Sequence, residues 1–426
     1  MSQTTKPAKR GRHTVARHGE LTSPGPLGLV LKLIGIALGV VLVASMGVAA
    51  YAAYDLTASF TGGAVALEGQ DPVPPDIGAI EGGVNLFIAG TDACEPAYAK
   101  YFGDRCSGPD AGGELNDVNM LVHISDAPRR VTVISFPRDL MVPIPACTRK
   151  DGSESPAMSR QPLNSAYSYG GLSCIVKTVS QLSGLNIPFA AKVTWGGVIQ
   201  VTNAVGGVDV CLASGIKDSY TGIDWPAGMR NIQGLEALQF LRTRHGVGDG
   251  SDLGRISNQQ QYMSRLARKL MSEDVLSNPA TLYKLATTAV HNVTPSQSLT
   301  NPLTLVQIAL AVKNVPFDEI AFVQYPVLSD PTDPNKVIPD LSSADALWAA
   351  LAANKPLKLT GAAGSNGGVV VVQPTPGATP SATPSATPTP GQTTAPEDQA
   401  VELPSSITGS TAAQQTCSNG NLRGNG

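Results

Sequence analysis

The stretch VNMLVHISDAPRRVTVISF, residues 118–136, contains two short apolar runs separated by a turn sequence. Val118–Ile124 and Arg130–Phe136 are rich in β-branched side chains, and SDAP lies between them. An earlier run, VNLFIAG at Val84–Gly90, has the same character. Because strands covered on both faces carry continuous rather than alternating apolar residues, these runs predict the buried centre of a sheet.

Helical stretches alternate with further apolar runs along the rest of the chain. Helices are expected at 164–182 (interrupted by Gly170 and Gly171), 232–244, 253–271, 303–312 and 342–353, and strands at 208–212 and 319–325. A sheet that alternates with helices in sequence is covered by them on both faces. We therefore predict an α/β fold, a three-layer α-β-α domain with a central mixed sheet, over residues 81–358.

An uncharged segment of 22 residues, Leu33–Tyr54, precedes this domain. It is long enough to cross a bilayer as a helix, and the basic residues in 1–32 place that tail in the cytoplasm. Cleavage of the segment as a signal peptide, near the small residues at 49–53, is the alternative. We expect a single-pass protein of the cell membrane, with residues 55–80 as a spacer and an extracytoplasmic domain.

Residues 359–426 are of low complexity. The tract QPTPGATPSATPSATPTPGQTTAP, residues 373–396, cannot bury a core, so a disordered, wall-spanning tail is predicted over 359–426. Cys417 lies beyond the tract, which would be explained if the tail folded back to form a disulfide.

Charge and cysteine content narrow the function further. After residue 54 the chain has 24 basic and 32 acidic residues, so binding to nucleic acid is not expected. All six cysteines follow the uncharged segment, which indicates disulfides in an oxidising compartment. Cys94 and Cys106 form the favoured pair, and the other four cysteines can pair in three ways. No cysteine or histidine spacing is typical of a zinc site.

Two aspartates lie beside predicted strands: Asp92 follows the first, and Asp117 precedes the second. Loops at strand ends build the ligand crevice of open α/β sheets. Two carboxylates that converge there could hold Mg²⁺ or Mn²⁺, whereas two solvated loop aspartates that cap backbone amides are the simpler alternative.

Arginines gather in two other places. Arg138 emerges at the end of a strand in SFPRD, and FLRTRHGVGDGSDLGRISNQQQ holds Arg242, Arg244, Arg255 and Gln259. Residues two apart share a side only in an extended segment, so the helix before Arg244 is expected to end there. Arg255 and Gln259 share a helical face if Ser251 or Asp252 caps a new helix. Together these side chains would form an anion cradle; a solvated charged face is the alternative.

These motifs, in this order, resemble the LytR–CpsA–Psr family of cell-wall glycopolymer ligases. The resemblance is carried by NLFIAGTD, LNDVNMLVHI, VISFPRDLMVPIP, LNSAYSYGG, VTNAVGGVDVCL, ALQFLRTRH and SDLGRISNQQQ. Neither GxSxG, HExxH nor a P-loop sequence occurs, so other hydrolase and nucleotide-binding classes are not supported. The alanine-, glycine- and proline-rich composition favours an actinobacterial type.

The resemblance implies a Mg²⁺-dependent phosphotransferase. Such an enzyme moves a glycan from a polyprenyl-diphosphate lipid onto a peptidoglycan sugar hydroxyl as a phosphodiester, with the lipid chain in an apolar tunnel. It also implies that Asp92 and Asp117 hold the metal, and that Arg138, Arg242, Arg244, Arg255 and Gln259 grip the diphosphate. Asp92, Asp117, Arg138 and Arg244 would then be the catalytic set, and Asp92 or Asp139 could act as the base.

One position departs from the family pattern: Leu115 in ELND stands where the family often has an arginine. One phosphate contact is therefore missing or comes from another part of the chain. Two alternatives use the same residues. A diphosphate-lipid hydrolase would use water as the acceptor, and a non-catalytic membrane protein would only bind the lipid-linked glycan to regulate wall assembly.

Overall fold

The computed structural model describes residues 60–73, 83–109, 111–372 and 400–421, with Ala44, Gly47, Tyr54 and Ala58 as isolated positions. From Phe60 onward the described residues belong to one compact unit, Leu56–Gly426. The basic tail and nearly all of the predicted membrane segment lie outside the described residues. In the part of the chain that is described, we find no helix with the length and apolarity needed to cross a membrane.

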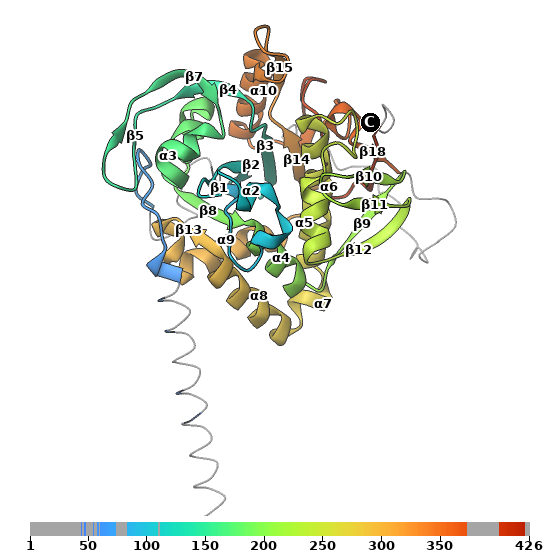
Figure 1. Ribbon diagram of the computed structural model, residues 1–426, viewed down its shortest axis with the longest axis horizontal. Helices are drawn as coiled ribbons and strands as arrows, with labels where there is room; N and C mark the ends of the chain where they lie inside the picture. Colours follow the sequence, from blue (N-terminus) through green and yellow to red (C-terminus); the bar gives the residue numbers. More distant parts are fainter. Residues whose placement is uncertain are drawn as a thin grey trace, which may run out of the picture. The chain divides into compact units, whose positions relative to one another are not determined.

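A seven-stranded mixed sheet forms the centre of this unit (Figure 1). Its strand order is β13 (Val293–Pro295), β8 (Phe189–Thr194), β1 (Val84–Thr91), β2 (Asn116–Ile124), β3 (Val131–Phe136), β14 (Ile320–Gln324) and β20 (Gly409–Thr411). Strand β2 runs antiparallel to β1 and β3, whereas β1 pairs in parallel with β8 and β3 with β14. The prediction of a central mixed sheet is confirmed.

Helices cover both faces of the sheet. Successive side chains of a strand point to opposite faces, so each strand contributes to two cores. Phe87 and Ala89 of β1 pack in the core beneath α3 (Ser165–Ser183) and α10 (Leu341–Ala352). The neighbouring Leu86 and Ile88 belong to the core on the other face, with side chains from α6 (Asp252–Leu270) and α9 (Pro302–Lys313). Both faces are therefore apolar, as the continuous runs predict.

A second, smaller sheet lies against α6 on the side of the unit that carries α5 (Leu235–Arg242). Its order is β12 (Gly228–Ile232), β9 (Val208–Leu212), β21 (Thr416–Ser418) and β18 (Val369–Val371). Two-stranded sheets pair β4 (Met141–Ile144) with β7 (Met158–Pro162), β5 (Cys147–Thr148) with β6 (Glu154–Ser155), β10 (Ile216–Asp218) with β11 (Ile223–Trp225), β15 (Val327–Ser329) with β16 (Val337–Pro339), and β17 (Leu357–Lys358) with β19 (Val401–Glu402). The remaining helices are α2 (Asp104–Ser107), α4 (Trp195–Ala204), α7 (Glu273–Leu276) and α8 (Pro279–Asn292), with 3₁₀ turns at η2 (Ala99–Tyr101), η3 (Gln297–Thr300), η4 (Phe317–Glu319) and η5 (Ser365–Gly367).

The predicted helices are present with shifted ends. Helix α3 has non-helical backbone angles at Gly170 and Gly171, as predicted. A Cβ at Gly170 would lie only 2.8 Å from the Cβ of Cys174, so the close packing there requires glycine. The helix expected from residue 232 begins at Leu235 instead, because Ile232 is the last residue of β12 and pairs with Val208.

The prediction that the chain is disordered from residue 359 is wrong for residues 359–372 and 400–421. Strand β20 pairs with β14 at the edge of the central sheet, and β21 pairs with both β18 and β9. Leu403, Ile407 and Ala412 are almost fully buried. Their burial in the core explains why this part of the tail is folded. Residues 373–399, which contain nearly all of the proline-rich tract, lie outside the described residues.

Three disulfides join the six cysteines. The predicted Cys94–Cys106 bond is confirmed. The pairing that the sequence leaves open is Cys147 with Cys174 and Cys211 with Cys417. The last bond ties the end of the described chain to β9 and confirms that the tail folds back.

Candidate active site

A β-bulge and a strand end bring the two aspartates to neighbouring strands. Gly90 of β1 lies opposite Val118, but the next residue, Thr91, lies opposite Asn116. Asp117 is therefore the extra residue of β2, and such bulges re-aim a side chain next to functional sites. Asp92 directly follows the last residue of β1.

Asp92 is buried and both of its carboxylate oxygens are engaged. One accepts a hydrogen bond from the backbone N–H of Leu115 (2.7 Å), and the other pairs with Nε of Arg105 (2.7 Å). Arg105 also donates to the carbonyl oxygens of Asp92 (3.2 Å) and Gly113 (2.7 Å). Its neighbour Cys106 is bonded to Cys94, so the disulfide helps to hold this arginine on Asp92.

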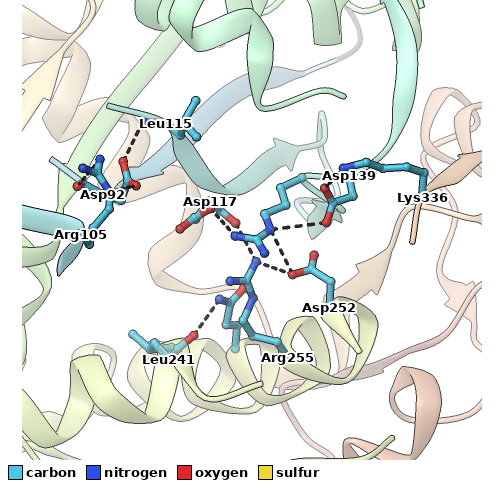
Figure 2. A network of polar contacts seen from close by, with 11 residues as sticks. Asp92, Arg105, Leu115, Asp117, Asp139, Leu241, Asp252, Arg255 and Lys336 are labelled. Atoms are coloured by element: carbon cyan, nitrogen blue, oxygen red, sulfur yellow. Dashed lines mark hydrogen bonds and ion pairs between the residues drawn. The ribbon is translucent and has the colours of Figure 1, made fainter. Parts of the chain in front are cut away.

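Asp117 belongs to a second group of contacts, separate from Asp92 in Figure 2. Its carboxylate accepts from Nη1 of Arg138 (2.7 Å), and its carbonyl oxygen accepts from Nη2 of Arg255 (3.3 Å). Asp252 lies between the two arginines, 2.5 Å from Nη2 of Arg255 and 3.5 Å from Nε of Arg138. Asp139 completes the group, 3.5 Å from Arg138 and 2.6 Å from Nζ of Lys336.

The charge of Arg138 is balanced within this second group. Burial acts to lower the pKa of its guanidinium, but the carboxylates of Asp117, Asp252 and Asp139 outweigh burial and raise that pKa above its ordinary value. Arg138 therefore stays charged, and most of its charge is compensated by the protein itself.

Arg242, the last residue of α5, has different surroundings. Its guanidinium lies 4.2 Å from the ring centroid of Trp195 and 5.2 Å from that of Phe102. Among the described residues, no carboxylate forms an ion pair with it. Its pKa is lowered, chiefly by burial and further by the nearby charge of Arg255, although Asp117 acts in the opposite direction. An arginine held over aromatic rings without a carboxylate partner is well suited to binding an anion.

Arg242 lines an apolar cavity of about 330 Å³ between the sheet and helices α4, α5, α6 and α8. Its apolar lining includes Ile88, Val118, Met120, Val198, Leu238 and Met263. Its polar lining includes Asp117, Arg242, Arg255 and Gln259. The cavity therefore combines a largely apolar wall with two guanidinium groups, which suits a ligand that has both an apolar and an anionic part.

The structure brings most of the predicted cradle together, but it places Arg244 elsewhere. Arg242, Arg255 and Gln259 line the cavity, and Arg138 reaches them through Asp117. Gln259 donates to the carbonyl oxygen of Leu241 (2.9 Å) and so fixes the end of α5 against α6. Arg244 is not among the cavity-lining residues; its Nε donates to the carbonyl oxygen of Gly250 (3.1 Å).

Buried Asp218 holds the loop that contains Arg244. Its carboxylate accepts from the hydroxyl of Thr243 (2.6 Å) and from the backbone N–H groups of Arg244 (3.1 Å) and Gly246 (3.3 Å). Helix α5 ends at Arg242 because Thr243 adopts an extended conformation, which confirms the predicted helix end. Ser251, rather than Asp252, caps α6: its side chain accepts from the N–H of Gly254.

Sequence patterns do not predict several residues of the site. Arg105 is 13 residues from Asp92, in the four-residue helix α2, which is too short to show a periodic pattern. The ring centroids of Trp195 and Phe102 lie 4.1 Å apart. Both residues are distant from Arg242 in sequence, so the sequence does not distinguish them from ordinary core aromatics. The sequence indicates Asp252 as a possible helix cap, and its spacing of three residues from Arg255 is also typical of a helical ion pair.

The donor set suits a hard divalent cation that keeps most of its water. Within the described part of the chain no three His, Cys, Asp or Glu side chains form a metal-binding group. Asp92 and Asp117 supply carboxylate oxygens, and each already pairs with an arginine. Mg²⁺ is commonly bound through one or two carboxylates plus substrate phosphates, so these residues fit a metal that arrives with a phosphate ligand.

Comparison with known proteins agrees with the motifs. The LytR_cpsA_psr family model matches residues 54–353. The cell wall biosynthesis protein LcpA of Corynebacterium glutamicum is 27% identical over 273 residues, covering 60% of this chain and 52% of that protein. The polyisoprenyl-teichoic acid–peptidoglycan teichoic acid transferase TagU of Enterococcus faecalis is 27% identical over 163 residues, covering 38% of this chain and 50% of that protein.

A crystal structure of a Streptococcus agalactiae protein shares the fold, with a TM-score of 0.50 and 20% identity over 63% of this chain and 86% of that chain. The present chain spans about half the length of the curated relatives it matches.

Proposed function

Because this chain belongs to the LytR–CpsA–Psr family, we propose that it is a phosphotransferase that attaches a glycan to peptidoglycan. The donor would be a glycan on a polyprenyl diphosphate, and the acceptor a peptidoglycan sugar hydroxyl. The printed names of its relatives, a cell wall biosynthesis protein and teichoic acid transferases that act on peptidoglycan, support an enzyme of cell-wall assembly.

One observation carries the proposal: Arg242 and Arg255 line the same cavity as a largely apolar wall. A polyprenyl diphosphate has a long hydrocarbon chain and a compact anionic head, and the cavity offers an apolar wall together with two guanidinium groups. Nucleic acids and sugars alone lack the apolar part, so they leave most of this wall without a partner.

The residues of the cavity would act mainly by positioning and by charge. As the acceptor oxygen forms a bond to the glycan-linked phosphorus, the bond to the bridging oxygen breaks and lipid monophosphate leaves. The proton of the acceptor hydroxyl passes to a carboxylate of the site, for which Asp92 and Asp139 are the candidates. Arg242, which has no carboxylate partner among the described residues, stabilises the charge that gathers on the leaving phosphate. Gln259 keeps Arg242 in place through the carbonyl oxygen of Leu241.

We also propose that Mg²⁺ or Mn²⁺ binds at Asp92 and Asp117 together with the diphosphate. The metal would add positive charge opposite the arginines when the donor is bound. The protein's part is to hold the two carboxylates on adjacent strands, one by the bulge of β2 and one by Arg105.

Transfer by the full-length chain in nanodiscs tests the function. Defined lipid-linked donors are mixed with nascent peptidoglycan, and both glycan on peptidoglycan and lipid monophosphate are measured, with and without EDTA. We expect transfer that stops on chelation and resumes with Mg²⁺, and that is abolished in Asp117→Ala with folding retained. Lipid monophosphate without glycan on peptidoglycan would show a hydrolase, and donor binding without turnover would show a regulatory protein.

A further inference from the structure

Helix α9 presents an apolar face to solvent. Leu303, Val306 and Leu310 have 58%, 52% and 62% of their surface exposed. Their spacing places them on one side of the helix, which we call the α9 face. On another side of α9, Ile308, Ala311 and Val312 pack against the core of the central sheet. The helix is therefore apolar on both sides, although only one side is covered by described residues.

Single exposed apolar residues are ordinary on protein surfaces, but a helix with three of them in register marks an interaction surface. The preceding helix, α8, continues this character. None of its residues is fully buried, and Tyr283 and Leu282 are 59% and 40% exposed. Some further partner is needed to cover this apolar surface.

Charge shows what kind of partner fits. Residues 278–314, which include both helices, contain no aspartate or glutamate, and they carry Lys284, Lys313 and His291. The chain after residue 54 is acidic on the whole, with 32 acidic against 24 basic residues. The two helices themselves, with exposed apolar residues, two lysines and no acidic residue, complement the outer layer of an anionic lipid bilayer.

The path of the chain leads to the same surface. The backbone N–H of Val65 donates to the carbonyl oxygen of Pro295, and its carbonyl oxygen accepts from Gln297, both at 2.9 Å. Pro295 and Gln297 lie in the connection between α8 and α9. Val65 comes only eleven residues after Tyr54, the end of the uncharged segment expected to span the membrane. Eleven residues reach at most about 40 Å, so a membrane anchor would hold this connection near the bilayer.

The apolar cavity reaches this part of the molecule as well. Its wall includes Ala289 in the last turns of α8 and Val293 at the start of β13. Residues of α8 and of the connection to α9 thus line the same cavity as Arg242.

We propose that the α9 face is a bilayer-docking surface that rests on the outer leaflet of a membrane containing anionic phospholipid. Docking orients the cavity relative to the lipid phase, so that a lipid substrate can be taken up from the membrane. The docking surface stands independently of the transfer reaction, because it is defined by exposure, charge and the position of Val65.

Site-directed fluorescence on the full-length chain tests the docking surface. All six cysteines are in disulfides, so a single introduced cysteine takes a thiol-reactive dye selectively. Leu310→Cys places the dye on the α9 face. Leu328→Cys is the matched control: Leu328 is 53% exposed in β15, and Figure 1 shows β15 on the other side of the central sheet from α9. Both proteins are placed in nanodiscs of phosphatidylcholine and phosphatidylglycerol, with a spin-label quencher on the lipid chains.

We expect strong quenching of the dye at position 310 and little at position 328. Adding Leu303→Glu and Val306→Glu should reduce the quenching at 310, and discs of phosphatidylcholine alone should give an intermediate value. Equal quenching at 310 and 328 would overturn the proposal. Weak quenching at 310 together with a dimer in analytical ultracentrifugation would also overturn it, because the face would then bind a second copy.

Discussion

Arg138 and Arg242 lie near the same carboxylate, Asp117, yet their charges are used differently. Arg138 is surrounded by Asp117, Asp139 and Asp252, and the pKa of its guanidinium is raised despite burial. Arg242 stands over Trp195 and Phe102, and burial lowers its pKa. The first arginine forms ion pairs with carboxylates of the protein, whereas the second forms no ion pair among the described residues and lines an apolar cavity. Resemblance to a motif does not separate the two; their surroundings do.

The sharpest test of this difference is Arg242→Met. The substitution keeps an apolar side chain over the rings but removes the guanidinium. We expect the rate of glycan transfer to fall about 100- to 1,000-fold, as for loss of one charge-stabilising donor, with little change in the free energy of unfolding. Donor turnover and urea unfolding are the measurements.

Arg230→Met is the matched control. Arg230 also stacks on a tryptophan, with its guanidinium 4.5 Å from the centroid of Trp225, but it does not line the cavity. Transfer should remain near the wild-type rate. If the two variants lost activity equally, the lack of an ion pair at Arg242 would have no bearing on transfer.

Arg138→Met should mainly lower the free energy of unfolding. It leaves Asp117 without its closest cation, while Asp139 keeps Lys336 and Asp252 keeps Arg255. Because the site is partly buried, we expect the free energy of unfolding to fall by about 2 kcal/mol. Lys217→Met, which breaks an exposed pair with Asp224, should cost less than about 1 kcal/mol. Equal urea midpoints for the two variants would contradict the structural role of Arg138.

Arg244 gives a third, intermediate case. It lies two residues from Arg242 in sequence but outside the cavity wall, and it donates to the carbonyl oxygen of Gly250. We expect Arg244→Met to slow transfer by less than about tenfold, because only one hydrogen bond of a loop is lost. A loss as large as that of Arg242→Met would show that the loop closes over the donor during the reaction.

The smallest effect is expected at Asp218, which supports that loop. Burial acts to raise the pKa of this carboxyl, but the hydroxyl of Thr243 and the backbone N–H groups of Arg244, Tyr220 and Gly246 outweigh it, so the pKa is lowered. A lowered pKa stabilises the fold above the ordinary value of 3.8, and that stability is lost as the pH falls through the folded value.

Asp218→Asn should therefore be less stable than the wild type at neutral pH, by about 1 kcal/mol, and nearly equal to it in acid. Urea unfolding at the two pH values measures the difference. Asp209→Asn, at an exposed position of β9, should change stability little at either pH. A constant deficit of Asp218→Asn across the pH range would mean that the carboxylate charge is not what holds the loop.

The centre of the fold was predictable because its signals are local. The apolar runs that become β1, β2 and β3 are long enough to show that both faces are covered, and Gly170 and Gly171 show where α3 is interrupted. The C-terminal strands were missed since β20 and β21 have three residues each, too few for a periodic pattern. They also follow a proline-rich tract, which is typical of disordered chain and therefore predicts disorder beyond it.

The candidate site was predictable only in part for a similar reason. Asp92, Asp117, Arg138, Arg242 and Arg255 belong to contiguous motifs, so their likeness to a family is visible. What distinguishes them is tertiary: Arg105 on Asp92, Asp252 between two arginines, and the rings under Arg242. Only the Asp252–Arg255 pair has a local spacing; the other contacts join segments that are distant in sequence, so no local pattern predicts them.

The return of the chain into the domain after residue 399 has a consequence for biosynthesis. Because a polypeptide is made from its N-terminus, β20 and Cys417 are produced long after the strand and the cysteine they join. A chain broken within residues 373–399 would leave the edge of β14 unpaired and Cys211 as a lone thiol. Unpaired strand edges promote aggregation, and unpaired thiols react. A truncated product would therefore expose an unpaired strand edge and a free thiol, which proteases and chaperones can recognise.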